Sequence, residues 1–169
     1  MLRLDGGASR RENCPVSNLI AAASAENLTQ VRELFREYHR WVGQPECFAS
    51  FEQELDGLPG EYVAPHGRLL LAMADGKPAG CAALRPFDAG RCEMKRLYVR
   101  PAFQGLGLGR RLAQAMIEAA RASRCTGLLL DTLPQMGSAI ALYRSLGFAS
   151  RAAYSSTPTP GALYFELRL

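Results

Sequence analysis

The feature that most constrains how this chain folds is a glycine-rich stretch within residues 97–116. A strand-like segment ends at Val99, Pro101 prevents it from continuing, and a series of strong helix formers follows the glycines. The glycines alternate along the chain, at Gly105, Gly107 and Gly109. Their conformational freedom allows backbone N–H groups to turn towards one point at a helix N-terminus, where the helix dipole also favours an anion. The stretch therefore predicts a phosphate or pyrophosphate site between a strand and a helix.

The spacing of these glycines distinguishes three kinds of phosphate-binding loop. A dinucleotide-binding fingerprint needs a further glycine where this sequence has Arg110. A P-loop needs GxxxxGK followed by Ser or Thr, which this sequence lacks. The remaining pattern is Q-x-x-G-x-G, which here reads Gln104-Gly105-Leu106-Gly107-Leu108-Gly109. Arg110 and Arg111 add positive charge beside it, so we expect an anionic ligand.

Around this loop, the hydrophobic pattern predicts alternating strands and helices. Apolar residues recur on one helical face between a capping Ser24 and a terminating Gly43, and Asp75-Gly76 indicates a hairpin. We expect strands at residues 18–23, 68–74, 79–85, 92–99, 127–132, 148–154 and 162–169, and helices at 24–43, 48–55, from the glycine loop to about 123, and 137–146. This order, β-α-α-β-β-β-α-β-α-β-β, predicts one mixed α/β domain over residues 18–169, preceded by a flexible N-terminal extension at 1–17.

A second motif lies downstream of the glycine loop. The pattern Ala-x-x-Leu-Tyr-x-x-x-Gly-Phe matches residues 139–148. Taken with the glycine loop and the element order over residues 18–169, it makes the chain resemble the GNAT (Gcn5-related N-acetyltransferase) superfamily. In that family the Q-x-x-G-x-G loop binds the pyrophosphate of acetyl-CoA. The resemblance implies an N-acetyltransferase with a splayed mixed sheet and with acetyl-CoA as the acyl donor.

The resemblance also assigns the cofactor-binding residues. The cofactor is expected between the strand that ends at Val99 and the strand at residues 127–132. The backbone of Leu97, Tyr98 and Val99 is expected to pair with the pantetheine arm, and the N–H of Val99 to donate to the thioester carbonyl. The residues expected to wrap the pyrophosphate are Gln104, Gly105, Leu106, Gly107, Leu108, Gly109 and Arg110. Where many members have a cofactor-contacting Asn, this chain has Met136-Gly137.

Acetyl transfer to an amine poses two proton problems. The acceptor's ammonium group, with a pKa of about 10.4, must lose a proton, and the departing thiolate leaves more easily beside a proton donor. In several GNAT enzymes a Glu at the position of Glu93, eleven residues before Gln104, is the general base. A Tyr at the position of Tyr143 is the general acid. From the residues alone, Glu93 is equally a surface carboxylate paired with Lys95 or Arg68, and Tyr143 a core residue whose hydroxyl bonds a carbonyl.

The composition excludes several other classes of protein. With 169 residues, 48% hydrophobic and 21% charged, the chain suits one globular domain. Its longest apolar run, at residues 69–74, is far shorter than the roughly 20 residues that span a bilayer. The first 17 residues lack the apolar segment of a signal peptide, so we expect a cytoplasmic protein without a membrane partner.

The cysteines and histidines predict neither a disulfide framework nor a metal site. The five cysteines are Cys14, Cys47, Cys81, Cys92 and Cys125, an odd number without a CxxC pair. We expect Cys81 and Cys92 to be buried apolar residues of strands. His39 and His66 lie too far apart in the sequence to indicate a shared metal.

The acceptor is expected to be a small-molecule primary amine, attacked directly in a ternary complex. A cysteine nucleophile is disfavoured because no cysteine lies at the expected sulfur position. The pocket is expected between residues 44–58, the turn at 85–87 and the loop at 154–164. Its candidate lining residues are Phe48, Phe51, Glu52, Phe87, Tyr154 and Tyr164.

Two alternatives come from other functional classes. A non-catalytic acyl-CoA-binding sensor would keep the glycine loop but lack a working base. Nucleic-acid binding is disfavoured, because the net charge is only +4 and most basic residues are dispersed. The one basic cluster is Lys95, Arg96, Arg100, Arg110 and Arg111, which we attribute to the CoA phosphates. A homodimer that pairs or exchanges the last strand is compatible with the family.

Overall fold

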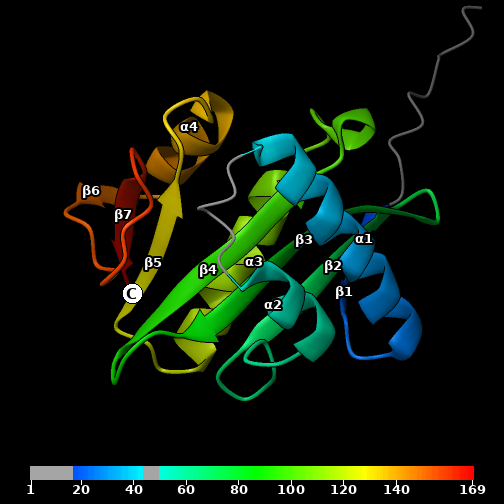
Figure 1. Ribbon diagram of the computed structural model, residues 1–169, viewed down its shortest axis with the longest axis horizontal. Coiled ribbons are helices and arrows are strands. Elements are labelled where there is room, and N and C mark those ends of the chain that lie inside the picture. The colour runs from blue at the N-terminus through cyan, green and yellow to red at the C-terminus, as the bar shows by residue number, and fades with distance from the viewer. Residues whose placement is uncertain (1–16, 44–49) are drawn as a thin grey trace, which may run out of the picture.

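The computed structural model describes residues 17–43 and 50–169. Its sheet has seven strands in the spatial order β1-β2-β3-β4-β5-β7-β6 (Figure 1). The strands are β1 (Ser17–Ala21), β2 (Arg68–Ala74), β3 (Lys77–Pro86), β4 (Arg91–Val99), β5 (Gly127–Thr132), β6 (Ala149–Arg151) and β7 (Leu163–Arg168). β4 and β5 run parallel, and every other neighbouring pair in this sheet is antiparallel. The sheet is therefore mixed, with its one parallel pair near the middle.

Helices cover both faces of this sheet. They are α1 (Ala25–Val42), α2 (Phe51–Gly57), α3 (Leu108–Ala122) and α4 (Gly137–Ser145), with a short 3-10 helix, η2 (Pro101–Phe103). α1 and α2 pack on one face, α3 packs on the other, and α4 follows β5 (Figure 1). This element order confirms the predicted β-α-α-β-β-β-α-β-α-β-β arrangement and the mixed α/β fold.

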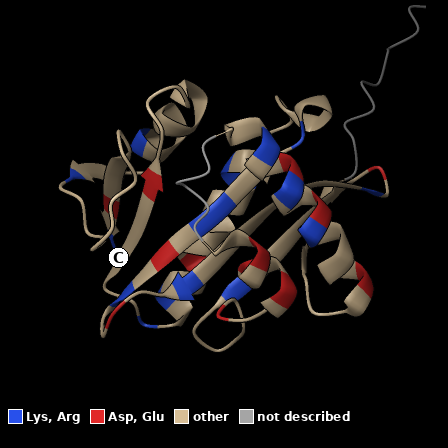
Figure 2. Cartoon of the chain, in the orientation of Figure 1, with Lys and Arg blue, Asp and Glu red and all other residues tan. Residues whose placement is uncertain are grey.

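Local capping sets the limits of α1, as its sequence predicts. The Oγ atom of Ser24 accepts a hydrogen bond of 3.2 Å from the backbone N–H of Asn27. At the other end, Gly43 adopts a left-handed φ of 65° and its N–H donates to the carbonyl of His39. Acidic and basic residues are interspersed along α1 and also along β4 (Figure 2).

Most elements lie within one or two residues of their predicted ranges, and two differ more clearly. The strand expected at residues 148–154 is limited to β6, which lies at the sheet edge beside β7. It is shorter because Tyr154 leaves the strand and donates its hydroxyl hydrogen to Glu93. The helix expected at residues 48–55 is α2, Phe51–Gly57, and the first part of the expected range lies outside the described residues.

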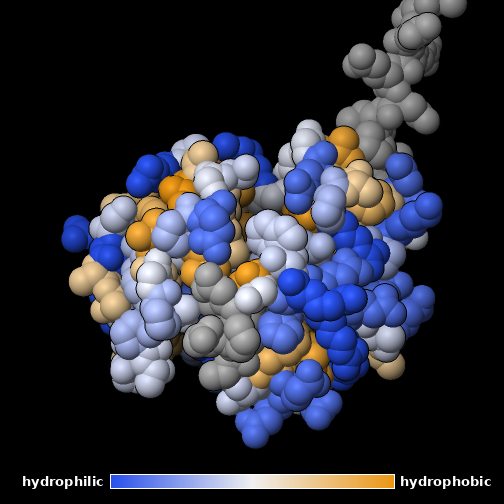
Figure 3. All heavy atoms as spheres, turned by 45° about the horizontal axis from the view of Figure 1, so that its top comes forward, coloured by the Kyte–Doolittle hydropathy of each residue, from blue (hydrophilic) through white to orange (hydrophobic). Residues whose placement is uncertain are grey.

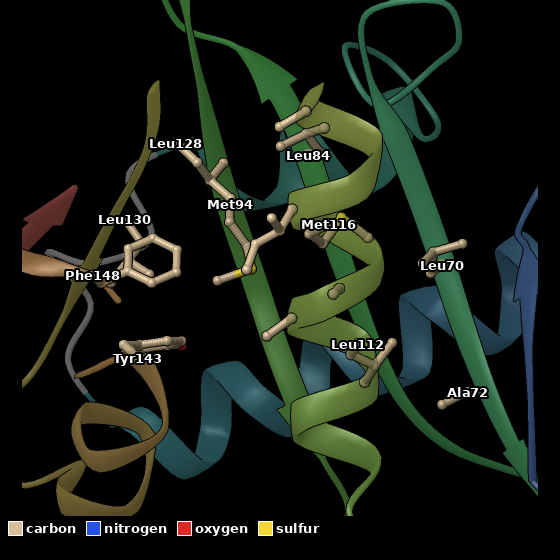
Figure 4. Packing of buried hydrophobic residues seen from close by; sticks show 14 of the residues in the cluster. Leu70, Ala72, Leu84, Met94, Leu112, Met116, Leu128, Leu130, Tyr143 and Phe148 are labelled. Atoms are coloured by element: carbon tan, nitrogen blue, oxygen red, sulfur yellow. The ribbon is translucent and has the colours of Figure 1, made fainter. Parts of the chain in front are cut away.

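Two hydrophobic cores lie on the two faces of the sheet. α3 contributes residues at helical spacing to the first, among them Leu108, Leu112, Met116 and Ile117. They pack against strand residues that include Leu70, Leu84, Met94, Leu128 and Leu130 (Figure 4). The second core joins α1 and α2 to the opposite face through Val31, Leu34, Phe35, Leu55 and Leu71. The alternating side chains of the central strands therefore serve both cores.

The structure corrects the expectation that no disulfide forms. Cys92, at the start of β4, and Cys125, in the connection from α3 to β5, form a disulfide. The parallel pairing of β4 with β5 sets Arg91 opposite Gly127, and this register brings the two cysteines together across 33 residues of sequence. Cys81 is buried and has a free thiol, as expected for a small core residue.

The surface carries few large hydrophobic residues. Among the described residues those exposed are Ile20, Trp41, Val63, Leu106 and Leu163. Hydrophilic residues cover much of the face seen in Figure 3, with hydrophobic residues in separate patches. None of the helices within residues 17–43 and 50–169 is long and apolar enough to cross a membrane.

We predict that Leu112→Ala lowers the free energy of unfolding by about 2–5 kcal/mol, because it leaves a cavity in the α3 core. Leu112 has 0% of its surface exposed, whereas Leu163 in β7 has 38%. Leu163→Ala is therefore the matched control and should cost about 1 kcal/mol or less. Urea unfolding of both variants measures the difference. Equal losses of stability would contradict the central place of α3 in the core.

Candidate active site

The candidate active site begins where β4 and β5 separate. Their backbone pairing covers only Arg91–Gly127 to Glu93–Leu129, after which the strands diverge. β4 also carries a bulge, since Arg96 and Leu97 together lie opposite one residue of β3, between Cys81 and Ala83. Arg96 has a left-handed φ of 57° at this bulge. The divergence and the bulge together open the sheet beside the second half of β4.

A cleft of about 580 Å³ lies in this opening, and we call it the glycine-loop cleft. Predicted cofactor residues that line it are Leu97, Val99, Gln104, Gly105, Gly107, Leu108 and Gly109. Three other predicted residues are not among its lining. Tyr98 packs on the α1 side with its ring 5.6 Å from Tyr38, Leu106 is exposed, and Arg110 donates to the Oγ atom of Ser145 at 2.8 Å.

The glycine loop leaves open space in front of the N-terminus of α3. Gly105 and Gly107 adopt left-handed φ values of 81° and 74°, and Gly107 directly precedes α3. A Cβ atom at either glycine would meet nothing within 4 Å. The side chain of Gln104 fixes the loop by donating to the carbonyl of Val99 at 3.1 Å. The positive end of α3 is therefore accessible to an anionic group.

Tyr143 of α4 lines the inner wall of the same cleft. Its side chain is buried among aromatic rings, with centroid distances of 5.8 Å to Phe148 and 6.5 Å to Phe165 (Figure 4). Burial raises the pKa of its hydroxyl well above the ordinary value, so the group stays protonated. Within the described residues this hydroxyl makes no hydrogen bond to a backbone carbonyl, which was the alternative role for a core tyrosine. Tyr143 is therefore a neutral phenol among the lining residues of the cleft.

A second cleft, of about 470 Å³, lies on the α2 side of β4, and we call it the tyrosine cleft. Its lining includes Tyr62, Tyr154 and Tyr164, together with Phe87. The ring of Tyr154 lies edge-on between Phe87 and Tyr164, with centroid distances of 5.0 Å and 5.2 Å. An aromatic wall beside charged groups suits a small organic molecule with a polar end.

Glu93 lies at the inner end of the tyrosine cleft and is 3% exposed. Its Oε2 atom accepts from Nε of Arg85 at 2.9 Å, and its Oε1 atom accepts from the hydroxyl of Tyr154 at 2.8 Å. The ammonium of Lys95 lies 3.5 Å from Oε1. Burial, followed by the charge of Glu93, raises the pKa of Tyr154, so that this phenol remains a donor. Of the sequence-based alternatives, the pairing of Glu93 with Lys95 is present, and Arg85 takes the place of Arg68.

Among the described residues, three charged ones border both clefts: Lys95, Arg96 and Asp131. Lys95 bridges the separated strands, with Nζ 2.9 Å from Oδ1 of Asp131 in β5. Arg96 forms a close ion pair with Glu54 of α2, and Tyr62 also donates to Glu54, at 2.6 Å. Burial alone would raise the pKa of Glu54, but the hydrogen bond and charge of Arg96 hold it below its usual range. These pairs form a charged junction between the clefts.

The ion pairs correct our interpretation of the basic cluster. Lys95 and Arg96 are paired as described above, and Arg100 is paired with Glu37 of α1 at 2.7 Å. Arg111 donates to the backbone of Ser17 at 3.1 Å. Most of the cluster therefore stabilises the fold, and it does not form one phosphate-binding patch.

The predicted acceptor residues are brought together only in part. Phe87, Tyr154 and Tyr164 line the tyrosine cleft, whereas Phe51 is buried in the α1–α2 core and Glu52 is exposed on α2. Phe48 lies outside the described residues. Sequence reasoning missed the charged lining residues Glu61 and Asp131, and it did not single out Glu54 and Arg85 within the segments that it predicted to form the pocket. The register of the β3–β4 hairpin, which sets Arg85 opposite Glu93, was the available signal for one of them.

Comparison with known proteins shows the family. Residues 28–148 match the acetyltransferase (GNAT) family, and the chain belongs to it. It is 34% identical over 154 residues to an N-acetyltransferase of Schizosaccharomyces pombe, covering 90% of this chain and 94% of that protein. It is 38% identical over 151 residues to a protein of Azospirillum brasilense named IAA acetyltransferase, and the match covers 88% of this chain and 97% of that protein. The chain is therefore an acyl-CoA-dependent N-acetyltransferase.

Solved structures agree with this fold. An acetyltransferase from Streptococcus agalactiae superimposes with a TM-score of 0.77 at 19% identity, covering 90% of this chain and 98% of that one. An acetyltransferase from Salmonella typhimurium, solved with its cofactor acetyl-CoA, superimposes with a TM-score of 0.69 at 22% identity. The match covers 90% of this chain and 93% of that one. At these identities the likeness establishes the fold alone.

We predict that Gly107→Ala weakens acetyl-CoA binding by at least about tenfold, because the new side chain disfavours the left-handed backbone that directs the loop N–H groups. Gly76→Ala is the matched control, since Gly76 has a similar φ of 72° and equally open surroundings, but lies in the β2–β3 hairpin. Isothermal titration with acetyl-CoA measures the affinity of each variant. Thermal unfolding measures the loss of stability that backbone strain causes in both variants. Equal affinities in the two variants would contradict a role for the loop.

Proposed function

We propose that this chain transfers an acetyl group from acetyl-CoA to the primary amine of a small metabolite or amino-acid-like molecule, by direct attack in a ternary complex. The observation that carries the proposal is the meeting of the two clefts at Lys95, Arg96 and Asp131. A donor in the glycine-loop cleft and an amine in the tyrosine cleft would meet there. Such an arrangement favours transfer between two bound molecules without an acyl-enzyme.

The glycine-loop cleft fits acetyl-CoA in two respects. The second half of β4 lies beyond the last backbone pair with β5, so this edge suits the extended pantetheine arm. The open glycine loop suits the pyrophosphate, with Gln104 to Arg110 around it. Acetyl-CoA, when bound, supplies a thioester carbonyl, and the N–H of Val99 is our candidate to stabilise its developing negative charge.

Two residues are proposed for proton transfer. Glu93 accepts the ammonium proton, directly or through water, so that the amine nitrogen forms the new C–N bond to the carbonyl carbon. As the C–S bond breaks, Tyr143 gives its proton to the departing sulfur, and the second proton that the nitrogen loses restores the Tyr143 hydroxyl. The burial of Tyr143 beside the cleft and the position of Glu93 within the tyrosine cleft support catalysis over a sensor without a working base.

The names of the relatives do not agree on one acceptor. One is called an IAA acetyltransferase and another, 33% identical over 94 residues, an N-alpha-acetyltransferase of Mycobacterium tuberculosis. Thiol release from acetyl-CoA should therefore be measured with amino acids, polyamines, arylalkylamines, aminoglycosides and lysine peptides. Turnover with at least one small amine is expected, and no turnover with any of these amines would contradict the proposal.

We predict that Tyr143→Phe lowers kcat by about 10- to 100-fold with little change in the KM for acetyl-CoA. The effect is moderate because a thiolate is a fair leaving group even without a proton donor. Phe148→Leu is a control for packing, since Phe148 contacts the Tyr143 ring but does not line either cleft. Pre-steady-state measurement of thiol release isolates the chemical step. An unchanged chemical rate in Tyr143→Phe would remove it as the general acid.

We predict that Glu93→Gln lowers kcat by about 100-fold or more, since the carboxylate that accepts the proton is lost. Tyr154→Phe serves as a second variant, because it removes one hydrogen bond to Glu93 and keeps the carboxylate. Tyr154→Phe should lower kcat much less than Glu93→Gln does. Rates of both variants across a range of pH, with thermal unfolding as a check on folding, test this role. Wild-type rates in Glu93→Gln at every pH would exclude Glu93 as the base.

A further inference from the structure

The charges of the tyrosine cleft narrow the class of acceptor. The carboxylates that line it are Glu54, Glu61, Glu93 and Asp131, and the lining cations are Arg85, Lys95 and Arg96. Among the described lining residues, carboxylates therefore exceed cations by one. A cleft with one excess negative charge favours a ligand that carries one positive charge.

Each of these cations already has a carboxylate partner. Arg85 pairs with Glu93 at 2.8 Å and Lys95 with Asp131 at 2.9 Å. Arg96 pairs with Glu54 within the charged junction. A carboxylate on the acceptor would have to displace one of these partners, and burying an unpaired charge is costly. The described lining residues therefore disfavour an acceptor that carries a carboxylate beside its amine.

Asp131 differs from the other lining carboxylates in its position, and from Glu54 and Glu93 also in its number of partners. It is the one carboxylate of the described lining that borders both clefts, and its side chain is 23% exposed. Within the part of the chain that the structure describes, its side chain hydrogen-bonds to Lys95 alone. Glu93, by contrast, accepts from both Arg85 and Tyr154. Asp131 is therefore the carboxylate best placed to receive an additional cation at the junction.

We infer that Asp131 binds the ammonium group of the acceptor, and that the acceptor is a primary arylalkylamine without a carboxylate beside the amine. This inference rests on the proposed acetyl transfer and specifies its substrate. The body of the amine lies against the wall formed by Phe87, Tyr154 and Tyr164, where aromatic rings favour apolar contact. The ammonium shares Asp131 with Lys95, and so lies near the thioester in one cleft and Glu93 in the other.

The test compares 2-phenylethylamine with phenylalanine, which differ only by the carboxylate. We predict that wild-type kcat/KM is at least about tenfold higher for 2-phenylethylamine. Asp131→Asn should raise the KM for 2-phenylethylamine by about 10- to 100-fold, through loss of a charge-assisted hydrogen bond, with the KM for acetyl-CoA unchanged. Lys95→Met removes the competing cation and should lower the KM for 2-phenylethylamine. Glu118→Gln, an exposed carboxylate change on α3, is the charge-matched control and should have no effect on either constant.

Each outcome separates this inference from the proposed function. Equal use of phenylalanine, or equal KM values for Asp131→Asn and Glu118→Gln, would overturn the inference and leave acetyl transfer intact. Loss of acetyl-CoA-induced thermal stabilisation in Asp131→Asn would also overturn it, because Asp131 would then hold the strands and not the amine. Turnover of other amines but not of 2-phenylethylamine overturns the arylalkylamine assignment. Absence of thiol release from the wild-type enzyme with every amine would overturn the proposed function and, with it, this inference.

Discussion

The early end of the parallel pairing between β4 and β5 is the constraint on which the rest of the site depends. A buried backbone N–H or C=O group must find a partner, so two strands that diverge leave groups that need another ligand. Only the segment from Arg91 to Glu93 pairs with β5, and the bulge at Arg96 turns the chain further. The glycine-loop cleft follows from this divergence, and an extended pantetheine arm is the kind of ligand that restores strand-like pairing.

Charged side chains stabilise the sheet where backbone pairing ends. Lys95 forms an ion pair with Asp131 across the gap between β4 and β5. Arg96 at the bulge pairs with Glu54 of α2, and Arg100 after the end of β4 pairs with Glu37 of α1. The Arg96–Glu54 pair is the least exposed of the three, so removing one of its partners would leave a poorly solvated charge uncompensated. Lys95, Arg96 and Asp131 also border both clefts, so the segment of β4 that stabilises the sheet is the one at which we propose that the two substrates meet.

What the sequence predicts well is determined by local interactions. The cap at Ser24, the Asp75-Gly76 hairpin and the glycine loop each depend on residues close in sequence, so their patterns identify them. The pairs Lys95–Asp131 and Glu54–Arg96 join residues 36 and 42 positions apart, and no periodicity reveals them. The Cys92–Cys125 disulfide was missed for the same reason. The strand expected at residues 148–154 is also longer than β6, and Tyr154, beyond the end of β6, donates to Glu93, which is distant in sequence.

The sequence specifies the glycine-loop cleft more strongly than the tyrosine cleft, because different parts of the chain build them. The glycine-loop cleft depends on backbone groups, whose positions are set by one short motif and the helix that follows it. The tyrosine cleft is built from side chains of α2 and the segment after it, of β3, β4 and β5, and of β7 and the segment before it, so its chemistry is fixed only once the chain has folded. A shared donor site is therefore compatible with relatives that differ in acceptor. In our proposal, the balance of charges around Asp131, and not the family motif, is the property that selects the amine.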